Sequence, residues 1–134
     1  MNDKIDRIVL DTTALIFLND FSPFKEIYTV QEVVEEVKDR LTSMKLTSLL
    51  KRLKIVDPNK DAVEEVSYIA EKTGDIEKLS KTDIKVLALA KQLTCPIMSD
   101  DYAIQNVAGH AGIKYISIFN KGIKSWSKEG NRKI

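Results

Sequence analysis

Cysteine and histidine are nearly absent from this sequence of 134 residues, which contains one of each, Cys95 and His110. A single cysteine excludes a disulfide framework within the chain and a zinc site built from several of its own cysteines. The lack of disulfides also predicts an intracellular, cytoplasmic protein. His110 is expected near a helix end, and we assign it no ligand role.

Long apolar runs are missing as well, since no uninterrupted run exceeds five residues. A membrane-spanning helix needs about 20 apolar residues, so no membrane partner is expected. The N-terminal MNDKID does not resemble a secretory leader. A hydrophobic fraction of 43% with 31% charged residues is typical of one globular domain with a real core.

Charge is distributed unevenly along the chain. Residues 120–134 carry five basic residues against Glu129, a local balance of +4, which leaves −3 for the remaining 119 residues of a chain with formal net charge +1. The sequence therefore predicts a domain over residues 1–119 followed by a basic tail or linker over residues 120–134.

Apolar periodicity predicts alternating strands and helices, which is typical of an α/β protein built from parallel βαβ units. The predicted strands are 5–10, 26–30, 54–58, 96–99 and 113–119. The predicted helices are one starting near Thr12, then 31–40, 43–53, 60–72 (ended by Gly74), 80–93 and 101–110.

Acidic residues follow two of these strands. Asp11 comes after the first, and Asp100 and Asp101 come after strand 96–99. The carboxyl ends of parallel strands meet at one edge of the sheet, where ligands gather. Each acid also has an ordinary explanation as the N-cap of the next helix, but two adjacent acids cannot both be the cap.

Two further acids lie on or beside a buried helix face. Asp83 fits a capping box with Ser80, yet it also heads an inward-facing row with Leu87, where a carboxylate requires a partner. In helix 31–40, Glu36 lies nearer the centre of the apolar stripe than Glu35 does.

Together these acids predict a metal site. Four like charges at one edge repel each other unless a cation is bound, and oxygen ligands without His or Cys indicate Mg²⁺ or Mn²⁺, as one ion or two. The predicted ligands are Asp11, Glu36, Asp83, Asp100 and Asp101.

The pattern resembles the PIN-domain ribonucleases, on LDTTALI (10–16), VVEEV (33–37), SKTDIKVLALA (80–90) and SDD (99–101). The resemblance implies a three-layer α/β/α domain with a central, mostly parallel sheet. It also implies a catalytic set of Asp11, Glu36, Asp83 and Asp101, with supporting hydroxyls from Thr13 and Ser99.

YTVQEVVEEVKDR, LSKTDIKVLALAKQL and SDDYAIQNVA are similar to blocks of the Nin-one-binding-protein branch of PIN domains. This likeness implies an endoribonuclease that matures the 3′ end of small-subunit ribosomal RNA in a pre-ribosomal particle. Asp101 matches the general PIN position, and Asp100 is the neighbour particular to this branch. The four-cysteine zinc ribbon usual in that branch has no counterpart here.

RNA is the expected partner, and homodimer formation is left open. Lys51, Arg52 and Lys54 are candidate RNA contacts. The tail offers further candidates: Lys121, Lys124, Trp126, Lys128, Arg132 and Lys133. Two alternatives remain, a VapC-type toxin ribonuclease with an antitoxin partner and a catalytically idle PIN-like binding module.

Overall fold

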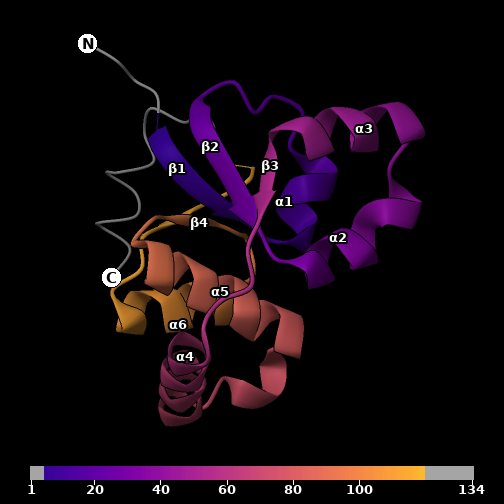
Figure 1. Ribbon diagram of the computed structural model, residues 1–134. Coiled ribbons are helices and arrows are strands. Elements are labelled where there is room, and N and C mark those ends of the chain that lie inside the picture. The colour runs from indigo at the N-terminus through magenta and orange to yellow at the C-terminus, as the bar shows by residue number, and fades with distance from the viewer. Residues whose placement is uncertain (1–4, 120–134) are drawn as a thin grey trace.

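The computed structural model describes residues 5–119, and its centre is a five-stranded sheet (Figure 1). The strands are β1 (Ile5–Leu10), β2 (Phe24–Thr29), β3 (Leu53–Ile55), β4 (Ile97–Met98) and β5 (Tyr115–Ile116). They lie in the order β3-β2-β1-β4-β5, and every pairing is parallel. The predicted parallel sheet is confirmed.

Helices cover both faces of the sheet. They are α1 (Thr12–Phe17), α2 (Gln31–Val37), α3 (Ser43–Arg52), α4 (Lys60–Thr73), α5 (Lys81–Leu93) and α6 (Tyr102–Ala111). The first three pack on one side and α4, α5 and α6 on the other, which confirms the three-layer α/β/α fold (Figure 1). Among residues 5–119, none of the helices is long and apolar enough to cross a membrane.

Most helix boundaries agree with the sequence pattern, whereas the strands predicted at 54–58, 96–99 and 113–119 are shorter and span Leu53–Ile55, Ile97–Met98 and Tyr115–Ile116. The strand predicted at 26–30 begins at Phe24 because Phe24 is in register with Ile5 of β1. The helix predicted at 31–40 ends at Val37 and continues as a 3₁₀ turn. Gly74 ends α4 as predicted, since its φ of 83° is left-handed and favours glycine.

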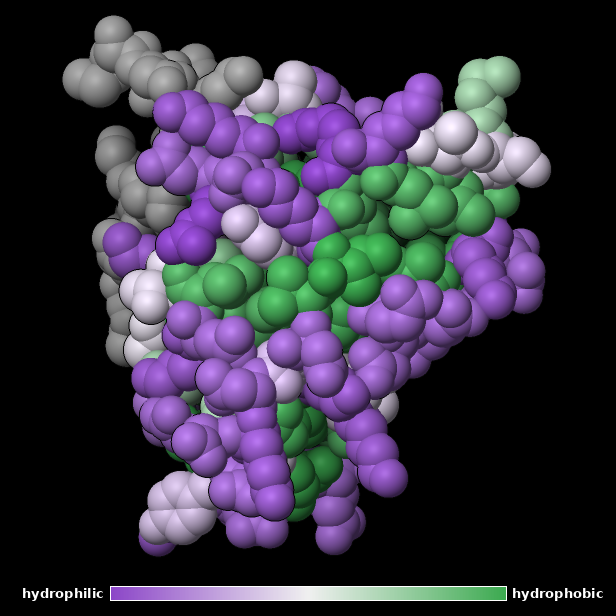
Figure 2. All heavy atoms as spheres, in the orientation of Figure 1, coloured by the Kyte–Doolittle hydropathy of each residue, from purple (hydrophilic) through white to green (hydrophobic). Residues whose placement is uncertain are grey.

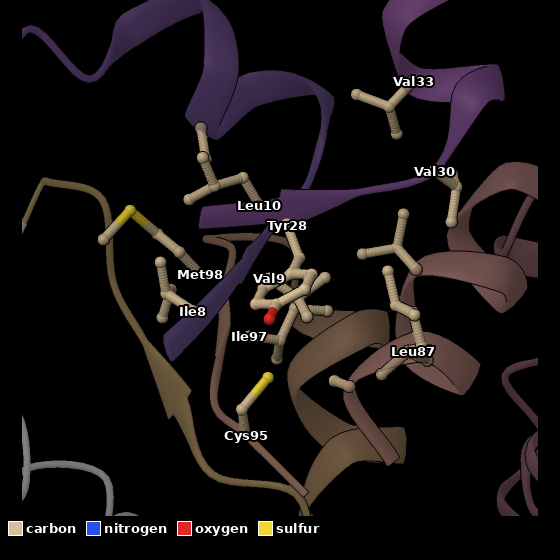
Figure 3. Close-up of a cluster of buried hydrophobic side chains, with 14 of the residues drawn as sticks. Ile8, Val9, Leu10, Tyr28, Val30, Val33, Leu87, Cys95, Ile97 and Met98 are labelled. Atoms are coloured by element: carbon tan, nitrogen blue, oxygen red, sulfur yellow. The ribbon is translucent and has the colours of Figure 1, made fainter. Parts of the chain in front are cut away.

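The core is built on both faces of β1 and β4 (Figure 3). Side chains alternate across a strand, so Val9 and its neighbour Ile97 lie toward Leu87 of α5, while Leu10 and Met98 lie on the opposite face. All five side chains are essentially inaccessible to solvent. This packing fixes the two strands whose ends carry the acids.

Three exposed aliphatic side chains lie on α3 and on the edge strand β3. Met44 and Leu50 on α3 and Ile55 on the edge strand β3 are 81%, 45% and 40% exposed. Figure 2 shows a band of apolar side chains across the middle of this face of the molecule. The apolar surface of α3 and β3 is thus separated from the strands β1 and β4 by β2.

Arg52, the last residue of α3, ties this helix to the start of β2 and to the loop before it. Its guanidinium donates to the carbonyl oxygens of Phe21 at 3.0 Å and Phe24 at 2.7 Å. Those two carbonyls are fixed by one planar group, which suits the forked geometry of arginine. Arg52 therefore has a structural role that the sequence pattern did not reveal.

We expect Arg52→Met to lower the free energy of unfolding by about 1–2 kcal/mol, because two charge-assisted hydrogen bonds are removed. Lys51→Met is the matched control, since Lys51 is its exposed neighbour on α3. Urea titration of both variants measures the difference. Equal stability of the two variants would contradict this role of Arg52.

Candidate active site

The site lies where the strand order changes direction, between β1 and β4. β1 connects to β2 on one side, whereas β4 and β5 extend the sheet on the other. Such a switch point opens a crevice at the carboxyl ends of the strands. Asp11 follows β1, and its backbone N–H donates to the carbonyl of Met98 in β4 at 3.4 Å. The two acid-bearing strand ends are therefore direct neighbours.

Asp11 is buried and caps α1. Its Oδ1 accepts a hydrogen bond from the backbone N–H of Ala14 at 2.8 Å, and its carboxylate also accepts one from the Ser99 side chain. Burial raises the pKa of Asp11 to about 6, and the charges of Asp83 and Asp100 add to this rise. The two hydrogen bonds lower the pKa but do not offset the desolvation.

Asp100 points into the protein after β4. Its Oδ1 accepts hydrogen bonds from the Ser117 hydroxyl and from the backbone N–H of Ile118, the latter at 3.0 Å. Its Oδ2 is buried and has no hydrogen-bond partner among the described residues. A buried carboxylate oxygen without a donor is costly, so this atom favours a ligand at this position.

Asp101 is the N-cap of α6. Its Oδ1 accepts from the backbone N–H groups of Ala103 at 2.8 Å and Ile104 at 3.1 Å. Of the two adjacent acids, Asp101 is thus the cap and Asp100 is not. Asp101 is exposed, whereas Asp100 is partly buried.

Asp83 forms the capping box that the sequence indicates. Its backbone N–H donates to the Ser80 hydroxyl at 3.0 Å, and its Oδ2 accepts from the Ser80 backbone N–H at 2.9 Å. The side chain is nevertheless half-buried, and desolvation raises its pKa, with contributions from the charges of Asp101 and Glu36. Asp83 is both a cap and a member of the acidic cluster.

Glu36 is held by two threonine hydroxyls. Thr12 donates to its Oε1 at 2.9 Å, and Thr82 donates to its Oε2 at 2.8 Å. The adjacent Glu35 accepts instead from Gln31 and pairs with Lys38. The structure therefore places Glu36 beside the starts of α1 and α5.

The five acids form one electrostatic cluster, because the charges of Asp83 and Asp100 act on Asp11, and those of Asp101 and Glu36 act on Asp83. Within residues 5–119, no group of three or more His, Cys, Asp or Glu side chains is already arranged around a metal position. Binding an ion here therefore requires side-chain shifts. A carboxylate has about four lone-pair sites, so capping leaves each acid further acceptor capacity.

The hydroxyls around the cluster differ in part from those expected. Ser99 is buried and donates to Asp11, whereas Thr13 is exposed and Thr12 is the neighbour that reaches an acid. Sequence reasoning missed Thr12, Thr82 and Ser117. The sequence offers one signal for two of them, since Thr12 and Thr82 are each next to an acid of the cluster.

The expected RNA contacts among the described residues are mostly engaged within the protein. Lys54 forms an ion pair with Glu26 at 3.0 Å, and Arg52 holds backbone carbonyls. Lys51 is exposed. The residues predicted in the tail lie outside the described residues.

A family model described as the PIN domain of ribonuclease matches residues 8–93. The endoribonuclease Nob1 of Pyrococcus abyssi is 43% identical over 120 residues, covering 88% of this chain and 71% of that protein. The endoribonuclease Nob1 of Archaeoglobus fulgidus is 38% identical, covering 86% and 70%. The chain belongs to the PIN-domain ribonucleases, on their Nob1 branch.

A second group of PIN-domain proteins is also similar. The ribonuclease VapC1 of Thermoplasma acidophilum is 34% identical over 121 residues, covering 90% of this chain and 61% of that protein. Its identity is lower than that of the two Nob1 proteins. The family resemblance drawn from the sequence is confirmed.

The raised pKa of Asp11 predicts a pH-dependent stability of this PIN domain. The folded pKa of about 6 exceeds the ordinary value of 3.8, so the folded state binds more protons between these values. Stability from this group is therefore lost as pH rises from about 4 to about 6. We expect Asp11→Asn, which retains a capping oxygen, to stabilise the metal-free protein at pH 7 by about 1–3 kcal/mol.

Urea unfolding of the wild type and Asp11→Asn at pH 4.5 and pH 7 measures this effect. The stability difference between the two proteins should grow with pH. A variant that is less stable than the wild type at pH 7, with a difference independent of pH, would show that the buried charge is not destabilising.

Proposed function

We propose that this PIN domain is a divalent-metal-dependent endoribonuclease that acts in the cytoplasm on the 3′ end of small-subunit ribosomal RNA precursors. The observation that carries the proposal is the acidic cluster at the carboxyl ends of β1 and β4. It combines a buried carboxylate of raised pKa, Asp11, with a buried oxygen of Asp100 that has no donor among the described residues.

The donor set fits a hard divalent cation. It consists of carboxylates and hydroxyls, which suit Mg²⁺ or Mn²⁺. Asp11, Glu36, Asp83 and Asp100 would hold one or two ions, with Asp101 at the margin. A bound ion supplies positive charge that lowers the pKa of an attacking water and stabilises the scissile phosphate.

The protein's own part in the reaction is positioning. The caps of α1, α5 and α6 fix the backbone at Asp11, Asp83 and Asp101. Burial of Asp11 and Asp100 removes water that would screen the charges of the cluster. The phosphodiester would lie against the exposed side of this edge, at Glu36 and Asp101.

Ribosomal RNA is favoured as the substrate because the chain resembles the branch that matures small-subunit ribosomal RNA, and its Nob1 relatives are named endoribonucleases. The VapC1 protein is named a ribonuclease, so a toxin function remains a second candidate with the same chemistry. An idle binding module is disfavoured, since every acid position of the PIN pattern is occupied. Cleavage of a ribosomal RNA 3′-end oligonucleotide, compared with unrelated RNA of equal length, separates the first two.

Asp83→Asn distinguishes a ligand from a cap. Asparagine retains an oxygen for the Ser80 N–H and removes one charge from a repulsive cluster, so metal-free stability should be unchanged or higher. Cleavage with Mn²⁺ should fall by at least about 100-fold, because the variant lacks a carboxylate that positions charge at the phosphate.

Glu35→Gln is the matched control, since Glu35 lies beside Glu36 but pairs away from the cluster. Melting temperature without metal and turnover with Mn²⁺ are measured on both variants. A less stable but fully active Asp83→Asn protein would leave Asp83 as a cap alone and remove it from the proposed site.

The basic tail is proposed to add RNA affinity without contributing to chemistry. Replacing its five basic residues by glutamine should weaken RNA binding. It should also flatten the plot of log affinity against log salt concentration, whose slope falls by about 0.7 for each phosphate that is no longer neutralised. The control changes Lys60 and Lys72 of α4 to glutamine. Binding isotherms at several salt concentrations test this, and identical slopes for the tail variant and the wild type would exclude an RNA-binding role for the tail.

A further inference from the structure

Glu36 is the acid of the cluster with the least support from its own element. It lies within α2 and is exposed, whereas Asp11, Asp83 and Asp101 are fixed as caps at helix starts. A glutamate has three rotatable side-chain bonds, so an exposed one samples many rotamers. Glu36 therefore needs help from outside α2 to keep its carboxylate at the site.

That help comes from two different elements. Thr12 at the start of α1 donates to Oε1, and Thr82 at the start of α5 donates to Oε2. Each carboxylate oxygen thus has its own hydroxyl, which fixes both the position of the group and the orientation of its plane. One lone pair on each oxygen remains for another partner.

Both threonines are themselves restrained. Thr12 directly follows the capping Asp11, and Thr82 directly precedes Asp83 of the capping box. Thr82 is also buried at 8% exposure, and its β-branched side chain has few rotamers. The orientation of Glu36 is therefore coupled to the same two helix starts that orient Asp11 and Asp83.

We propose that Thr82 and Thr12 are positioning residues that orient the Glu36 carboxylate toward Asp11 and Asp83 for metal-dependent cleavage. This inference rests on the proposed endoribonuclease function. Thr82 is the more important of the two, because its hydrogen bond to Glu36 is partly buried while that of Thr12 is exposed. The competing explanation is that the Thr82–Glu36 hydrogen bond only joins α5 to α2, in which case its loss would change stability alone.

The test compares Thr82→Val, Thr12→Val and the double variant with wild type. Valine keeps the branched shape and replaces the hydroxyl by a methyl group. We expect Thr82→Val to weaken Mn²⁺ binding measured by calorimetry, and to lower kcat, by about 10–100-fold, which is the usual effect of removing a hydrogen bond that orients a ligand. KM for the RNA should be unchanged. Thr12→Val should show the same pattern more weakly.

Three controls make the result specific. Thr82→Ser restores a hydroxyl and should recover most of the Mn²⁺ affinity. Thr47→Val, on the exposed surface of α3, should match wild type. In a Glu36→Gln background, Thr82→Val should cause little further decrease, because the effects of residues that act through one group are not additive.

Two results would overturn the positioning role while leaving the proposed function intact. One is wild-type Mn²⁺ binding and turnover in both Thr82→Val and the double variant. The other is a decrease in activity that follows melting temperature and is not recovered by Thr82→Ser. A wild-type protein that neither binds Mn²⁺ nor cleaves RNA would instead contradict the proposed function itself.

Discussion

The parallel pairing of β1 with β4 is the constraint on which the site depends. These strands lie far apart in the sequence, yet Leu10 is in register with Met98. The residues that follow, Asp11 on one strand and Ser99 and Asp100 on the other, therefore emerge side by side. The packing of Val9, Ile97 and Leu87 maintains this register, since a slip of one residue would turn their side chains to the wrong face.

Placing several carboxylates at one edge has an electrostatic cost, and the protein offsets part of it locally. The N-termini of α5 and α6 meet the cluster, and their partial positive charge favours nearby anions. Hydroxyls from Ser99 and Thr82 donate to acids of the cluster. Burial of Asp11 remains uncompensated, as its raised pKa indicates. We therefore expect the proposed cation site to lower the stability of the protein when no ion is bound.

The capping and functional interpretations of the acids are compatible. Asp83 satisfies every requirement of a capping box, yet its pKa is raised by burial and by neighbouring acids. A cap fixes the backbone and one carboxylate oxygen, and the rest of the group remains available. Helix starts at the carboxyl edge of a parallel sheet thus supply anchored acids without additional structural elements.

The sequence by itself determined the alternation of strands and helices, the parallel sheet and the acids at its carboxyl edge. These follow from short-range features, namely apolar periodicity, caps such as Ser80, and Gly74 at the end of α4. It also favoured Glu36 over Glu35, because helical geometry places Glu36 nearer the edge of the buried face of α2.

Only the tertiary structure decided which partner each hydroxyl and each basic side chain binds. Thr82 reaches Glu36 from 46 residues away, and Arg52 binds backbone carbonyls rather than remaining free for RNA. A single sequence carries no local signal for such contacts, because threonine and arginine occur on any surface. The physical reason is that periodicity in the sequence specifies which face of a helix or strand is buried. Which side chains then meet depends on the distance and angle at which the elements pack.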